Sequence, residues 1–164
     1  STYLYPDNAA KGEMTGDAGN AHANAMNFEV HEVYGGGVHA VGAHEDVHVI
    51  AWHRIGDTGY ALMGEGLAVW VNGPWWGEEL EHWVVQYRDD GELPTLQELI
   101  DSFWAISDGI TYPVAGHFVA WLEAEYGVEM VKDLYVAPDL AQALASELGM
   151  SLAEIESAWL ATLP

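Results

Sequence analysis

The chain has 164 residues, half of them hydrophobic, and its 26 acidic and 4 basic residues give a net charge of −22 at pH 7. This length suits a single domain with material for a hydrophobic core. The scarcity of Lys and Arg argues against a nucleic-acid partner, because phosphate binding needs clustered cations. The absence of cysteine excludes disulfides, and no apolar run approaches the roughly 20 residues of a membrane span.

The N-terminal part, about residues 1–37, is predicted to hold the β structure. β-Prone residues that end at a proline mark the first strand, and apolar alternation marks the second. Glycines at positions 35–37 then break the chain and allow a turn. The expected segments are a strand over Thr2–Tyr5, one or two helical turns over Asn8–Met14, a loop over Thr15–Asn20 and a strand over Asn27–Val33.

The helical part, about residues 38–164, is predicted from apolar residues that recur at helical spacing. It begins with a helix over Val38–Trp52, a loop over Arg54–Gly59 and a helix around Glu65 that ends at Asn72-Gly73-Pro74. Further helices are expected over Glu78–Arg88, Leu96–Phe103, Thr111–Tyr126, Val128–Tyr135, Leu140–Leu148 and Ser151–Leu160, the last with a Ser151–Glu154 capping box. The expected fold class is therefore α+β, mainly α. No linker or repeat divides the chain, so we expect one domain over residues 1–164.

The segment His44-Glu45-Asp46-Val47-His48 forms the pattern H-E-x-x-H. On a helix, a spacing of four puts both imidazoles on one face, one turn apart, where they can hold a single zinc ion. Glu45 is then a carboxylate placed to accept a proton from the attacking water. A hydrolytic zinc site takes three protein ligands and an open fourth position. Glu65, which lies between two glycines, is the candidate third ligand.

Together these segments resemble the gluzincin zinc metallopeptidases, in which a second helix carries a glutamate ligand in an E-G-[LF]-A-type motif. Glu65-Gly66-Leu67-Ala68 matches that motif at all four positions. The residues from Tyr112 to Leu122, with Tyr126-Gly127, are similar to the Y-x-x-A-G-x-F-x-x-x-L…YG segment of small peptidase-MA-like domains. The resemblance covers most of the chain from Val38 and implies that His44, His48 and Glu65 bind Zn²⁺.

The activity that the resemblance implies is zinc-dependent hydrolysis of peptide bonds in a peptide or protein substrate. Glu45 is the expected general base. Tyr112 is the expected donor to the oxyanion, because its neutral phenol can donate a hydrogen bond, and His117 is the alternative. No exopeptidase motif precedes the zinc helix, which favours an endopeptidase. The alternatives are an aminopeptidase, a zinc-binding module without proteolytic activity, and a structural domain whose histidines bind no metal.

Further expectations concern the surroundings of the site and the compartment. Many zinc peptidases place an acid four residues after the glutamate ligand, but this chain has Val69 there. The acceptor that orients a zinc histidine is therefore expected from Asp57, Asp108 or a backbone carbonyl. Trp75 and Trp76 are expected in the core, with the wall of a hydrophobic substrate pocket as the alternative. A chain that begins without Met suggests a mature or trimmed protein, secreted or in the cell envelope, with the cytoplasm of a halophile as the alternative.

Overall fold

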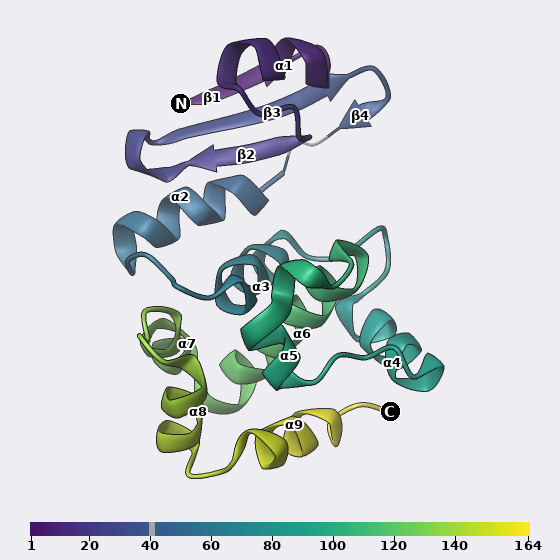
Figure 1. Cartoon of the computed structure of the whole chain (residues 1–164), viewed down its shortest axis with the longest axis vertical. Coiled ribbons are helices and arrows are strands. Elements are labelled where there is room, and N and C mark those ends of the chain that lie inside the picture. Colours follow the sequence, from purple (N-terminus) through teal and green to yellow (C-terminus); the bar gives the residue numbers. More distant parts are fainter. Residues whose placement is uncertain (40–41) are drawn as a thin grey trace. The chain divides into compact units, whose positions relative to one another are not determined.

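The computed structural model describes residues 1–39 and 42–164 and divides into two compact units, Ser1–Arg54 and Ile55–Pro164 (Figure 1). The first unit combines a small sheet with two α-helices, and the second is built from helices. The predicted class, α+β and mainly α, is confirmed. The expectation of one domain over residues 1–164 stays a prediction. Among the described helices, none has the length and apolar character needed to cross a bilayer.

The first unit is organised around its longest strand, β3. The strands are β1 (Thr2–Tyr5), β2 (Ala21–Asn24), β3 (Glu29–Gly35) and β4 (Val38–His39). β3 is parallel to β1 and antiparallel to β2 and β4. Val30 and Val33 point to opposite faces of β3 and both are buried, so the strand is covered on both faces. The packing elements are α1 (Asn8–Thr15), the 3₁₀ helix η1 (Ala25–Asn27) and α2 (His44–Arg54).

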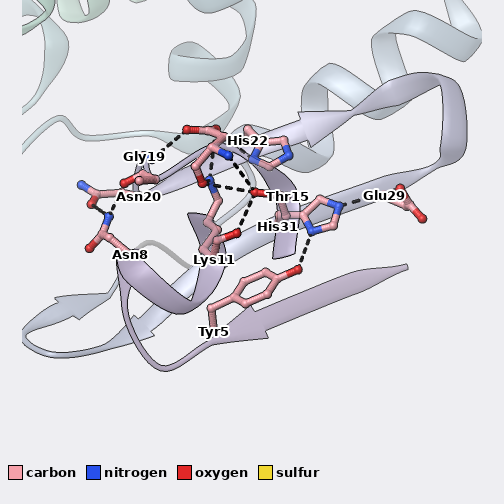
Figure 2. Close-up of polar contacts among 11 residues, drawn as sticks. Tyr5, Asn8, Lys11, Thr15, Gly19, Asn20, His22, Glu29 and His31 are labelled. Carbon is pink, nitrogen blue, oxygen red and sulfur yellow. Dashed lines mark hydrogen bonds and ion pairs between the residues drawn. The ribbon is translucent and has the colours of Figure 1, made fainter. Parts of the chain in front are cut away.

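A fully buried lysine links α1 to the loop that follows it (Figure 2). The Lys11 ammonium donates to the backbone carbonyl and to Oδ2 of Asp17, both at 3.1 Å. The same carboxylate oxygen lies 3.0 Å from His22 Nδ1 on β2. Across the sheet, the His31 ring stacks between Tyr3 and His22, with centroid distances of 4.9 and 4.7 Å. Because an unpaired buried ammonium is costly, Asp17 is the partner that permits the burial of Lys11.

The second unit packs around the long helix α6. Its helices are α3 (Ala61–Asn72), α4 (Leu80–Asp90), α5 (Leu96–Ser102), the 3₁₀ helix η2 (Phe103–Ala105), α6 (Asp108–Tyr126), α7 (Val128–Tyr135), α8 (Leu140–Leu148) and α9 (Leu152–Leu160). α3 crosses α6 closely because each contributes a glycine. A Cβ on Gly116 would lie 2.6 Å from Val69 Cγ1, so this crossing requires glycine. Phe118 and Trp159 are fully buried in the resulting core.

Most predicted elements are confirmed, with boundaries that differ by up to three residues. The predicted helix over Val38–Trp52 is wrong at its start, because Val38–His39 form β4 and the helix begins at His44. The physical reason is the turn at Gly36 and Gly37, whose φ values of 58° and 88° return the chain as a hairpin onto β3. Positions 40 and 41 of the predicted helix lie outside the described residues. The strand β2 was not predicted, since its short sequence lacks β-branched residues.

Candidate metal centre

His44 and His48 lie one turn apart on α2 and face each other. Their ring centroids are 4.9 Å apart with planes at 80°, and their Nε2 atoms are separated by 3.2 Å. Both residues are half-buried. The approach follows from the i, i+4 spacing of an α-helix. One face of α2 therefore brings two imidazole nitrogens to the same point.

Both ends of α2 are fixed within the first unit. Before the helix, the buried Glu32 carboxylate on β3 accepts a hydrogen bond from Gly42 N–H at 3.3 Å. Burial raises the pKa of the Glu32 carboxyl, although the hydrogen bond from Gly42 opposes the shift. At the other end, His53 Nε2 lies 2.8 Å from the carbonyl oxygen of Ala25 in η1. These contacts set the position of the helix that carries both histidines.

Glu65 lies on α3 between glycines that permit close packing. A Cβ on Gly66 would lie 2.7 Å from the Ala115 carbonyl oxygen of α6. Tyr135 on α7 is 4% exposed. Burial, followed by the charges of Asp57 and Glu65, raises the pKa of Tyr135 to about 12. The charges of Asp57, one of the residues expected as an orienting acceptor, and of Glu65 therefore both act on the neutral phenol of Tyr135.

Within the part of the chain that the structure describes, His44, His48 and Glu65 form a group in which each residue offers one ligand atom, and these atoms all lie within 4.8 Å of one another. Zinc binds nitrogen and oxygen at about 2.0–2.2 Å, so two ligands at the tetrahedral angle are roughly 3.3 Å apart. The 3.2 Å between the two histidine nitrogens matches that spacing. The donor set of two nitrogens and one oxygen fits a divalent metal ion.

Glu45 and Tyr112, the expected catalytic residues, are both half-buried. Glu45 follows His44 in the first turn of α2. Tyr112 lies on α6, where its ring packs against Trp75 and Phe103 at centroid distances of 5.3 and 6.1 Å. These aromatic contacts fix the ring of Tyr112 within the second unit. The catalytic roles of Glu45 and Tyr112 stay predictions.

The turn of α6 that carries Tyr112 contains a proline whose missing hydrogen bond is replaced. Pro113 has no N–H to donate to the carbonyl of Gly109, four residues earlier. The Tyr87 hydroxyl donates to that carbonyl at 2.9 Å instead. Burial raises the pKa of Tyr87, so the hydroxyl keeps the proton it donates. α6 therefore continues through Pro113 as far as Tyr126.

His117, the alternative oxyanion donor, and Asp108, a candidate orienting acceptor, each make a hydrogen bond within the second unit. His117 Nδ1 accepts a hydrogen bond from Trp159 Nε1 at 2.9 Å, because tryptophan can only donate. Burial lowers the pKa of His117, and the charge of Glu81 opposes that shift. Asp108 Oδ1 accepts from the N–H of the next residue, Gly109, at 2.8 Å. These contacts hold His117 in the packing of α6 and occupy Asp108 at the start of its own helix.

Trp76 does not lie in the core, and the core-packing expectation is wrong for this residue. Its exposed fraction is 69%. Trp75 and Glu78 exchange two backbone hydrogen bonds, at 2.9 and 3.1 Å, and close a two-residue turn. The φ values are 52° at Trp76 and 88° at Gly77, the combination of a type I′ turn. Trp76 is thus held in a backbone conformation that glycine and asparagine prefer.

Comparisons with protein families, with curated proteins and with solved structures find no match for this chain. The gluzincin resemblance therefore depends on the motifs of the sequence itself. Three relationships within the second unit were not predicted: Tyr87 with the Gly109 carbonyl, Trp159 with His117, and the effect of Asp57 and Glu65 on Tyr135. The partners in each relationship lie far apart in the sequence, so no local pattern reveals the contact between them.

Proposed function

We propose that this protein is a zinc-dependent peptidase of the gluzincin type. The observation that carries the proposal is the group of His44, His48 and Glu65, whose ligand atoms lie within 4.8 Å of one another. Three protein ligands and an open fourth position are the arrangement of catalytic zinc. Glu45, next to the first ligand in the sequence, supplies the carboxylate that peptide hydrolysis needs as a base.

The mechanism assigns a separate task to each residue. When bound, zinc would polarise the carbonyl of the scissile bond and lower the pKa of the attacking water toward ~7. His44, His48 and Glu65 hold the ion. Glu45 accepts the proton of the attacking water and passes it to the leaving amine. The neutral phenol of Tyr112 donates a hydrogen bond to the oxygen that develops negative charge.

The substrate class is a peptide or a protein cleaved within its chain. An aminopeptidase needs a carboxylate that binds the amino terminus of the substrate, and Glu32 and Asp46 are the candidates near α2. The buried Glu32 already accepts a hydrogen bond from Gly42 N–H, which favours a structural role for it. The net charge of −22 attracts basic substrates at low ionic strength.

A cleavage assay with a matched pair of variants tests this proposal. The zinc-loaded chain is incubated with a mixed peptide library, and mass spectrometry identifies the products. Glu45→Gln should retain zinc and lose roughly 10²–10⁴-fold in turnover, the range for a general base. Asp46→Asn removes the same charge from the next residue, which is exposed, and should still cleave. Full activity of Glu45→Gln would overturn the assignment of the base.

Other outcomes of the assay identify the alternatives. Zinc retention without cleavage of any peptide indicates a non-proteolytic zinc module. Stepwise loss of N-terminal residues indicates an aminopeptidase. Absence of bound zinc indicates a structural domain in which the 3.2 Å contact of His44 and His48 is only a hydrogen bond.

A further inference from the structure

A pocket of about 490 Å³ lies within the second unit, lined by the end of α3, the beginning of α4 and the middle of α6. This volume is in the range of sites for small organic ligands. The lining includes the apolar side chains of Trp70, Leu80 and Ala120. It also includes three titratable side chains, those of Glu79, Glu81 and His117. None of these six residues belongs to the candidate metal group, so the pocket is a second feature that needs its own explanation.

His117 gives this pocket a hydrogen-bond donor of fixed identity. Its Nδ1 accepts from Trp159 Nε1, so a neutral ring carries its proton on Nε2. Burial lowers the pKa of His117, which keeps the ring neutral. Within the described residues, no hydrogen bond engages His117 Nε2. The ring therefore offers one N–H to an acceptor on a ligand.

The carboxylates of Glu79 and Glu81 make the mouth of the pocket negative. Both residues are exposed. The second unit has two basic residues, and their ion pairs within the described part of the chain lie elsewhere: Arg88 with Asp89 and Lys132 with Glu129. Within the described part of the second unit, neither Arg88 nor Lys132 pairs with Glu79 or Glu81, so no cation of this unit neutralises the mouth. A bound cation is the complement that these charges favour.

We propose that this pocket binds a small organic ammonium that also carries an apolar group and a hydrogen-bond acceptor, as an α-amino amide does. The ammonium pairs with Glu79 and Glu81. The apolar group packs against the Trp70 indole, a large apolar surface in the lining. The acceptor, which is a carbonyl in an amino amide, accepts a hydrogen bond from Nε2–H of His117. Each part of the ligand corresponds to one chemical group in the lining.

Three matched ligands test the proposal by isothermal titration calorimetry with the full chain. Phenylalaninamide has all three features, N-acetylphenylalaninamide lacks the cation, and phenethylamine lacks the carbonyl. Phenylalaninamide should bind tightest. The acetylated compound should bind about 10-fold more weakly, because it loses charge-assisted hydrogen bonds, and phenethylamine about 5-fold more weakly, because it loses one neutral hydrogen bond. No binding of phenylalaninamide, or equal binding of the acetylated compound, would overturn the proposal.

A pair of double variants locates the binding. Glu79→Gln with Glu81→Gln should weaken phenylalaninamide about 10-fold and remove its advantage over the acetylated compound. The control, Glu125→Gln with Glu147→Gln, removes the same charge from exposed positions outside the pocket and should leave binding unchanged. Because all four positions are exposed, both variants should fold. Binding that is equal in the two variants would place the ligand elsewhere, at a bound metal for instance, and would refute the pocket.

Discussion

The Nε2 atoms of His44 and His48 lie 3.2 Å apart on one face of α2. Without a metal, one imidazole at this distance donates its N–H to the lone pair of the other. A metal ion needs the lone pairs of both nitrogens instead. The same backbone geometry therefore serves either a hydrogen bond or a shared ion, and metal analysis separates the two.

Removal of one histidine ligand should prevent stoichiometric metal binding. Substitution of a residue that hydrogen-bonds a metal ligand typically lowers metal affinity by roughly 10–100-fold. We expect His48→Ala, which removes a ligand itself, to lower the affinity for zinc by more than that. His82→Ala is the matched control, since His82 is an exposed histidine of the second unit outside the candidate metal group. Elemental analysis after dialysis measures both variants. Equal zinc content in the two would contradict the assignment of His48.

The turn at Trp76 should store backbone strain. Asparagine tolerates the positive φ of 52° and precedes Gly77 in the favoured Asn-Gly order. We expect Trp76→Asn to exceed Trp76→Ala in free energy of unfolding by about 1 kcal/mol, because both variants lose the indole and only the alanine keeps the strain. Urea denaturation compares the two. Identical midpoints would show that the turn is not strained.

The hydrogen bond from Tyr87 to the Gly109 carbonyl should stabilise α6. Tyr87→Phe leaves a buried carbonyl unpaired and should cost about 1–3 kcal/mol of the free energy of unfolding. Pro113→Ala supplies the missing N–H to the same carbonyl, so Tyr87→Phe should cost less in that background. Denaturation of the two single variants and the double variant completes the cycle. Additive costs would mean that Tyr87 does not substitute for the missing N–H.

The lowered pKa of His117 should make the stability of the protein depend on pH. Burial keeps the proton off the folded ring, whereas the unfolded chain takes it up near the ordinary value of 6.5. As the pH falls through that value, the unfolded state binds the additional proton and the free energy of unfolding decreases. From about pH 8 to about pH 5, His117→Gln should lose less stability than the wild type. The exposed His82→Gln should behave as the wild type, and an unchanged slope in His117→Gln would count against this account.

Local relationships were the predictable part of the structure. The approach of His44 and His48 follows from helical spacing alone, and the Ser151–Glu154 capping box lies within one turn and is confirmed. The error at Val38 arose because Gly36-Gly37 ends a strand whether the chain then enters a helix or turns back as a hairpin. Only the pairing of β4 with β3 shows that it turns back.

Relationships between distant residues could not be predicted. Nothing in the sequence connects Tyr87 with the Gly109 carbonyl or Tyr135 with Glu65, because packing of separate helices creates both. Lys11 is a sharper case, since lysine is rarely buried and its burial depends on Asp17 in the following loop. The hydrophobic pattern sets which faces pack together, but it does not specify these polar partners.

Elemental analysis of the purified chain and of Glu65→Ala, after zinc loading and dialysis, tests whether His44, His48 and Glu65 together bind one metal ion. We expect about one zinc ion per wild-type chain, the content of a three-ligand site, and a substoichiometric content in the variant. A wild-type chain without zinc, or a Glu65→Ala variant that retains it in full, would contradict the assignment of His44, His48 and Glu65 as the metal ligands.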